Sequence, residues 1–277
     1  MDTVTPAVSV SRLARSFASP NAPLVLDVRR SKAFDQDAAT IPGALRALPD
    51  TICAWIPLLA KTRPIVAFCV HGHEVSRGAA RTLVGAGFDA CFLEGGFAGW
   101  REAKLPVLAQ QPDLGVPATI GAPSRWVTRE RPKIDRVACP WLVRRFVDPS
   151  AEFLYVPSAQ VLDAATREHA IPYDIPGVRF THRGDACSFD AFIADFGLTD
   201  AGLAELATIV RAADTGRLDH SPQAPGLAAM SLGLSALYPD DLEMLGHGMR
   251  MYDALYAWIK SARGEVHNAD LFRTKQP

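Results

Sequence analysis

One stretch decides the fold of the N-terminal half: Pro64-Ile65-Val66-Ala67-Phe68-Cys69-Val70-His71-Gly72-His73-Glu74-Val75-Ser76-Arg77. Its apolar run predicts a buried strand that delivers Cys69 to a short polar loop with one glycine. Residues 77–86 then have the composition of a helix. Free N–H groups at the start of a helix favour an anion. The stretch therefore predicts a lowered pKa for the Cys69 thiol, with the thiolate as the resting species.

Strand and helix patterns alternate on both sides of this stretch. Short apolar runs at 24–28 and 90–93 predict strands, and the patterns at 9–17 and 52–59 predict helices. Such alternation predicts an α/β fold, with a mostly parallel sheet flanked by helices on both faces. Asp27 lies near the C-terminal end of its strand, where open α/β sheets place their sites.

Composition excludes several classes of protein. The 277 residues are 48% hydrophobic and 21% charged, and the formal net charge is −1, so a global cationic field for nucleic acid is absent. No run approaches the roughly 20 apolar residues of a membrane span, and residues 1–16 do not have the pattern of a secretory leader. We therefore expect a cytoplasmic protein with neither a membrane nor a nucleic acid as its partner.

The cysteines predict free thiols rather than a structural framework. They are odd in number, widely scattered and without a C-x-x-C motif, which argues against disulfides and against a four-cysteine zinc site. Four of them are expected to be small hydrophobic residues without chemistry. Only Cys69 has the surroundings of a reactive thiol. The full set is Cys53, Cys69, Cys91, Cys139 and Cys187.

Proline and glycine interrupt the regular patterns between residues 109 and 124. This composition predicts a semi-rigid linker between a domain at 1–108 and a domain at 125–277. In the second half, strand patterns are few. One lies within 126–132, where a strand runs into a helix, and another at 151–156, whereas helical patterns dominate. The C-terminal domain is therefore expected to be a mainly helical α+β domain.

Four motifs of the first half resemble the rhodanese family in order and spacing. They are Val25-Leu26-Asp27-Val28-Arg29, Ile41-Pro42-Gly43-Ala44, Cys69-x-x-Gly72 and Leu93-Glu94-Gly95-Gly96-Phe97-x-x-Gly99-Trp100. The resemblance implies a sulfurtransferase whose Cys69 carries a persulfide from a small-molecule sulfur donor to a thiol or protein acceptor. No cofactor is required for that reaction. The implied site comprises the loop Val70, His71, Gly72, His73, Glu74 and Val75, with Asp27 and Arg29 as support for the loop.

Two positions depart from the rhodanese pattern. Many members have an arginine where Glu74 stands, so we expect Glu74 to raise the Cys69 pKa or to select a cationic or neutral acceptor over thiosulfate. Thr40 replaces the usual histidine before Ile41. A related fold hosts cysteine phosphatases, but these need an arginine at the position of Val75. An alternative function is that of a thiol, redox or oxyanion sensor without rapid turnover.

The second half resembles the C-terminal domain of chromate-resistance proteins. The resemblance implies involvement in chromate resistance, as a sensor or regulator, and assigns no reaction. The matching stretches are 126–136, 139–142, 180–189, Ala213-Asp214-Thr215 and 238–241, with His247 and 252–254 in the last predicted helix.

Histidines and carboxylates of this half suggest a transition-metal site. His182-x-x-Asp185 is the most ligand-like pair, and His247 could reach it from the last helix. Cys187, Asp214 and His220 are further candidates. The alternative is that these side chains are satisfied core or capping residues.

A basic stretch suggests an oxyanion site instead. Arg129, Arg131 and Arg136 carry the paired N–H donors that bind tetrahedral oxyanions such as sulfate or chromate. The same donors can equally bind DNA phosphates. The alternative is a solvated helix face in which Glu130 and Asp135 balance the arginines.

Overall fold

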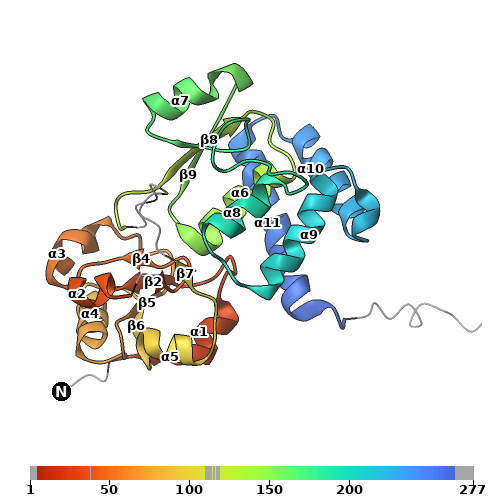
Figure 1. The fold of residues 1–277 in the computed structure, drawn as a ribbon. Helices are drawn as coiled ribbons and strands as arrows, with labels where there is room; N and C mark the ends of the chain where they lie inside the picture. The colour runs from red at the N-terminus through yellow and green to blue at the C-terminus, as the bar shows by residue number, and fades with distance from the viewer. Residues whose placement is uncertain (1–4, 38, 110–113, 115, 117–118, 266–277) are drawn as a thin grey trace, which may run out of the picture.

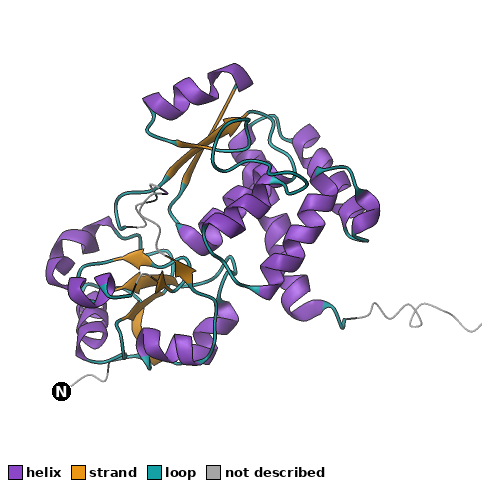
Figure 2. Ribbon diagram, viewed as in Figure 1, coloured by secondary structure: helices purple, strands orange, loops and turns teal. Residues whose placement is uncertain are grey.

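Two regions of different secondary structure make up the chain (Figures 1 and 2). The computed structural model describes all residues except 1–4, 38, 110–113, 115, 117–118 and 266–277. The N-terminal region is a sheet between layers of helices, and the C-terminal region is dominated by helices. Both predicted fold classes are confirmed. Among the described residues, no helix has the length and apolar character that crossing a membrane requires.

The N-terminal sheet is parallel throughout, with the strand order β1-β6-β5-β2-β4. Two of its three inner strands, β2 and β5, are buried along their whole length, as expected for a parallel sheet covered on both faces. All five strands end at the same edge of the sheet. The strands are β1 (Ala7–Val8), β2 (Leu24–Asp27), β4 (Leu45–Arg46), β5 (Ile65–Phe68) and β6 (Ala90–Leu93).

Helices cover both faces of this sheet. α1 (Val10–Ser16) and α5 (Gly96–Glu102) pack on the face that carries Val25, Val66 and Phe68. α3 (Ile52–Trp55) and α4 (Glu74–Gly85) pack on the face that carries Leu26 and Ala67. The short α2 (Ser31–Asp35) follows β2.

Two predicted helices have different bounds in the structure. The predicted helix at 77–86 begins three residues earlier, at Glu74. The predicted helix at 52–59 is α3 followed by a 3-10 turn, Ile56–Leu58. Pro57 lies in that turn and lacks the N–H group that a continued α-helix would need.

The C-terminal domain contains a three-stranded parallel sheet, ordered β10-β8-β9. α7 (Val161–Arg167) packs on the face that carries Val127. On the other face Trp126 packs on the rings of Phe180 and Phe192, each at a centroid distance of 5.2 Å. The strands are β8 (Arg125–Arg129), β9 (Glu152–Val156) and β10 (Ile171–Pro172), and the remaining helices are α6 (Asp135–Leu142), α8 (Ser188–Asp195), α9 (Ala201–Asp214), α10 (Ala224–Leu237) and α11 (Asp241–Ala257).

Pro140 lies inside α6, where the sequence predicts a kink. The helix continues through Pro140 and changes to a π-helical turn, Val143–Val147. A similar π turn, Trp258–Ala262, extends α11. Such turns accommodate a local mismatch without ending the helix.

The two domains touch along the edge where the strands of the first sheet begin. Gly43, just before β4, donates its N–H to the carbonyl oxygen of Phe146 at 2.7 Å. Pro23 and Arg63, which precede β2 and β5, line a small pocket together with Arg145. The C-terminal domain therefore packs against the opposite edge of the sheet from the one where β5 delivers Cys69.

Parts of the predicted linker pack against the two domains. β7 (Leu108–Ala109) pairs with β3 (Ala39–Thr40), and Leu114 is buried in the core of the C-terminal domain. Thr119 bridges to Arg46 of the first domain. The linker residues 110–113, 115 and 117–118 lie outside the described residues.

Candidate functional site

Cys69 sits at the junction of β5 and the loop that leads to α4. Its side chain is almost fully buried, with 7% of the residue exposed. Its Sγ lies 3.2 Å from the Oγ of Ser76, a fully buried residue in the first turn of α4. Ser76 belongs to the stretch that predicts the site, but the sequence assigns it no role. Because α4 begins at Glu74 rather than at residue 77, the Ser76 hydroxyl faces the sulfur.

Backbone contacts turn the loop toward the sulfur. α5 donates the N–H of Phe97 to the carbonyl oxygen of Cys69, and that of Ala98 to the carbonyl oxygen of Val70, each at 2.9 Å. With these carbonyls held by α5, the N–H groups of His71, His73 and Ser76 are free to face Sγ. The loop thus presents N–H donors to the thiol, together with the Ser76 hydroxyl, which also lies 3.3 Å from the carbonyl oxygen of His73.

Two competing effects set the pKa of the Cys69 thiol. Burial raises this pKa, whereas hydrogen bonds from the Ser76 hydroxyl and from the loop N–H groups lower it. The hydrogen bonds together outweigh burial, so the pKa lies below its ordinary value. The predicted direction of the shift is confirmed.

Glycine is required at two points of this loop. Gly72 has φ +72°, and a Cβ there would lie 2.4 Å from the carbonyl oxygen of Leu93. Gly96 has φ +58°, and its Cβ would lie 2.4 Å from the carbonyl oxygen of Cys69. Only a residue without a side chain allows this backbone approach. The motifs Cys69-x-x-Gly72 and Glu94-Gly95-Gly96 are therefore two halves of one close contact.

Glu74 is not among the leading causes of the Cys69 pKa shift, which are burial and hydrogen bonds. Its side chain is exposed. The acceptor preference that we expect from Glu74 stays a prediction. Glu74 is the first residue of α4, where a carboxylate favours the positive end of the helix. His71 and His73 are also exposed, with ring centroids 5.9 Å apart, and Val75 is half-buried.

Asp27 and Arg29 form a buried ion pair at the end of β2. Both are 1% exposed, and Arg29 Nε donates to Asp27 Oδ1 at 2.9 Å. Thr40, which replaces the usual histidine of the rhodanese pattern, donates its hydroxyl to the same carboxylate at 3.1 Å. The Arg29 guanidinium also lies over the ring of Phe97, 4.7 Å from its centroid. Because Phe97 holds the Cys69 carbonyl, the pair contacts the loop through α5.

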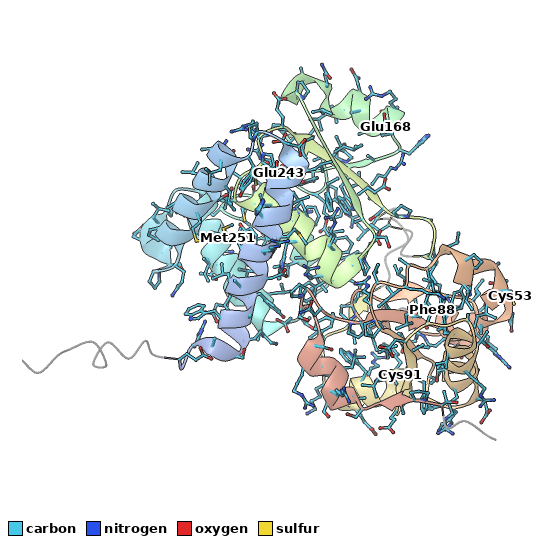
Figure 3. All side chains as sticks on the ribbon, turned by 180° about the vertical axis from the view of Figure 1, so that it is seen from behind. Cys53, Phe88, Cys91, Glu168, Glu243 and Met251 are labelled. Atoms are coloured by element: carbon cyan, nitrogen blue, oxygen red, sulfur yellow. The ribbon has the colours of Figure 1, made fainter. Side chains whose placement is uncertain are left out.

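Other cysteines differ from Cys69 in their surroundings. Burial, with the nearby Asp89, raises the pKa of Cys91 to about 11. Burial likewise raises the pKa of Cys139 and Cys187. Cys53 is exposed on α3, and Figure 3 marks it together with Cys91.

The structure does not assemble the predicted metal set His182, Asp185 and His247, and that prediction needs correction. The Asp185 side chain is 81% exposed and pairs with Arg217 at 2.8 Å, because it lies in a tight turn that directs it outward. The His247 ring stacks on Tyr238 with a centroid distance of 4.0 Å.

His182 instead meets three carboxylates that come from separate segments. Its Nε2 lies 3.2 Å from Asp135 Oδ2, 3.2 Å from Asp214 Oδ2 and 3.5 Å from Asp174 Oδ1. Asp135 begins α6, Asp214 ends α9, and Asp174 follows β10. The N–H of Ser188, at the start of α8, donates to Asp135 Oδ2 at 3.3 Å. We call His182, Asp135, Asp174 and Asp214 the His182 cluster.

Protonation within the His182 cluster is strongly perturbed. A hydrogen bond to Asp135 raises the pKa of His182 to about 9. Burial, and then the neighbouring charge of Asp135, raise the pKa of Asp214 to about 7. Burial opposes ionisation of Asp135 too, but its hydrogen bonds to His182 and Asp214 leave its pKa below the ordinary value. Asp135 thus stays ionised, and its negative charge favours the protonated form of Asp214.

The predicted oxyanion arginines are occupied by internal partners. Arg129 and Arg136 both bind Asp174 Oδ2, at 2.8 and 3.2 Å. Arg131 turns toward α10, where its guanidinium donates to the carbonyl oxygen of Ser235. The three therefore do not converge on one open anion site.

Sequence reasoning misses Asp135 and Asp174 as members of the His182 cluster. The sequence places Asp135 on a solvated face, although it stands in a stretch that matches the chromate-resistance domain. Asp174 carries no signal in the sequence, because its position depends on how β10 pairs with β8.

Comparison with known proteins gives two matches along the chain. The pattern of the rhodanese-like domain matches residues 9–103, and that of the ChrB C-terminal domain matches residues 126–259. The chain belongs to the rhodanese family and carries a ChrB C-terminal domain. We refer to the two parts as the rhodanese-like domain and the ChrB-type domain.

Each domain has a curated relative. The chain is 36% identical to Protein ChrB of Cupriavidus metallidurans over 140 residues, which are 50% of this chain and 42% of that protein. It is 30% identical to the thiosulfate sulfurtransferase GlpE of Tolumonas auensis over 95 residues, which are 34% of this chain and 86% of that protein. Among solved structures, a rhodanese-related protein from Thermoplasma volcanium matches with a TM-score of 0.33 and 22% identity, over 37% of this chain and 96% of that one.

Proposed function

We propose that the chain is a sulfurtransferase that passes a sulfane sulfur through a persulfide on Cys69. The observation that carries this proposal is the donor loop, in which the Ser76 hydroxyl and the N–H groups of His71, His73 and Ser76 face a buried sulfur. A persulfide is anionic at neutral pH and needs such donors. The loop needs no metal or cofactor for this task.

The reaction is a pair of displacements at sulfur. The Cys69 thiolate attacks the outer sulfur of a donor such as thiosulfate, the S–S bond of the donor breaks, and sulfite leaves with the electron pair. The outer sulfur then remains on Cys69 as a persulfide anion. A thiolate or cyanide acceptor attacks that sulfur, and Cys69 leaves as the thiolate.

The test is a thiosulfate–cyanide assay on the full chain. Cys69→Ala should reduce the rate to that of the reaction without protein, whereas Cys53→Ala, which removes an exposed thiol, should keep the rate of the unmodified chain. Mass spectrometry after thiosulfate treatment should show one added sulfur on the peptide that contains Cys69. Equal activity of Cys69→Ala and the unmodified chain would disprove sulfur transfer through this residue.

We also propose that sulfur transfer serves chromate resistance, on the strength of the ChrB-type domain. A chain that gains one sulfur on Cys69 but does not turn over would indicate the alternative function, a sensor. Both functions predict that cells expressing the Cys69→Ala chain survive chromate less well than cells expressing the unmodified chain. Survival equal to that of cells with the unmodified chain would remove Cys69 from chromate resistance.

A further inference from the structure

The ChrB-type domain holds three donor atoms at the spacing of metal ligands. The Nε2 of His182 and the Oδ2 atoms of Asp135 and Asp214 all lie within 4.8 Å of one another. Both N···O distances from His182 are 3.2 Å. Ligand atoms about 2.1 Å from one divalent ion are about 3 Å apart when they occupy neighbouring positions. The three atoms therefore need little movement to bind an ion.

The charge of the His182 cluster distinguishes it from an exposed acidic patch. The side chains of Asp135 and Asp214 are 3% and 15% exposed. Within the part of the chain that the structure describes, neither carboxylate has a lysine partner or an arginine partner closer than 4 Å, since Arg129 and Arg136 bind Asp174. Burying carboxylates without a cation is costly. Among the described side chains, the His182 imidazole is thus the one ionisable nitrogen within 4 Å of these two buried carboxylates, so two negative charges face at most one positive charge.

Helix ends and outer hydrogen bonds surround the same place. Asp214 is the last residue of the 14-residue α9, so the negative end of that helix lies at the cluster. Asp135 and Ser188, by contrast, begin α6 and α8, whose positive ends favour the ionised carboxylate that binds a metal. The N–H of Ser188 fixes Asp135, and its hydroxyl donates to Asp174 Oδ1 at 2.7 Å. Such outer partners orient the ligands of metal sites. The His182 side chain is 42% exposed, so solvent can reach the donor atoms.

We propose that Asp135, His182 and Asp214 bind a divalent first-row transition ion, with Asp174 and Ser188 orienting the ligands. Two carboxylate oxygens and one imidazole nitrogen suit ions such as Mn²⁺, Fe²⁺ and Zn²⁺ better than the thiolate-selective ions. Three protein ligands leave positions open for water or a substrate. The site is independent of sulfur transfer at Cys69.

The test is Mn²⁺ binding to the metal-free full chain. Binding is measured as the loss of the free-ion signal in electron paramagnetic resonance. The measurement uses the Cys69→Ser chain, so that neither the thiol nor its activity affects the result. One saturable Mn²⁺ per chain is expected. His182→Ala and Asp214→Asn should each weaken binding by at least about 10-fold.

Two matched variants serve as controls. His247→Ala removes a histidine of the same domain, and Asp185→Asn neutralises an aspartate of the same sequence motif, but neither side chain belongs to the His182 cluster. Both should bind Mn²⁺ like the parent chain. Absence of saturable binding in the parent, or equal loss in test and control variants, would overturn the proposal.

A second measurement guards against variants that fold poorly. Mn²⁺ should raise the melting temperature of the parent chain, because a ligand that binds only the folded state stabilises it. The isosteric Asp214→Asn chain should lose most of this rise while it keeps the circular dichroism of the parent. A rise of the same size in Asp214→Asn would count against the site.

Discussion

The Cys69 loop and the His182 cluster are built in different ways. Backbone N–H groups of one continuous stretch, with one hydroxyl, surround the sulfur of Cys69. The His182 cluster consists of side chains from four segments that lie far apart in the sequence. The two sites are also separated by the sheet, since the ChrB-type domain packs against the edge where the strands begin. Neither site contributes a residue to the other.

This difference determines which substitutions each site tolerates. The Cys69 loop depends on a close approach of two backbone segments, so a substitution that adds a Cβ to a glycine should disrupt it most. The His182 cluster depends on the charge of its side chains, so replacing an aspartate with the isosteric asparagine should disrupt it most. Variants of each kind, with matched controls, test whether the two sites differ in this way.

The largest effect is expected from Gly96→Ala. The new Cβ would meet the carbonyl oxygen of Cys69 at 2.4 Å, in a backbone conformation with φ +58°. Displacement of the loop should lower sulfur transfer by about 100-fold and the free energy of unfolding by about 3 kcal/mol. Cyanide assays and thermal unfolding measure the two effects.

Gly78→Ala provides the control for this prediction. Gly78 lies in α4, and a Cβ added there would have no neighbouring atom within 4 Å, so alanine should raise the free energy of unfolding by up to about 1 kcal/mol. If Gly96→Ala were as active and stable as Gly78→Ala, the loop would not depend on its backbone contact with α5.

Asp174→Ala should have the next largest effect. Its carboxylate is 4% exposed and accepts from Arg129, Arg136 and Ser188. Removing it leaves two partly buried guanidinium groups without a counter-charge, which costs about 3 kcal/mol. Asp185→Ala, which removes an exposed partner of Arg217, should leave the melting temperature almost unchanged. Equal melting temperatures for the two variants would show that the His182 cluster does not stabilise its domain.

The smallest effect is expected at Ser76. The Cys69 pKa is below its ordinary value, so the alkylation rate of the thiol rises with pH through a midpoint below that of a free cysteine. A hydrogen bond to a charged group contributes about 1.5 kcal/mol, which corresponds to about one pKa unit. Ser76→Ala should therefore move the midpoint up by about one unit and slow alkylation about 10-fold at pH values below it.

Thr82→Ala is the matched control, since Thr82 is another hydroxyl of α4 and bonds the carbonyl oxygen of Gly78 on the exposed side. Its midpoint should equal that of the unmodified chain. The rates come from iodoacetamide labelling followed by mass spectrometry of the peptide with Cys69. A midpoint that does not move in Ser76→Ala would leave the backbone N–H groups as the whole cause of the shift.

The sequence by itself determined the α/β domain and the position of the Cys69 thiol at the end of a buried strand. A buried run, a cysteine, a glycine and a helix follow one another within 64–77, so local chain geometry places the donors around the sulfur. The direction of the Cys69 pKa shift follows from the same stretch. The role of Ser76 escaped sequence reasoning because it depends on α4 beginning at Glu74.

Only the tertiary structure decided which residues meet His182. Asp185 is three positions away in the sequence but points to solvent, whereas Asp135 and Asp214 arrive from the beginning of α6 and the end of α9. The predicted linker is likewise packed where Leu114 enters the core of the ChrB-type domain. The physical reason is the same in both cases. Backbone donors of the Cys69 loop come from consecutive residues, and two backbone bonds from α5 hold them in place. The partners of the His182 side chain depend on the packing of distant helices, which no local pattern encodes.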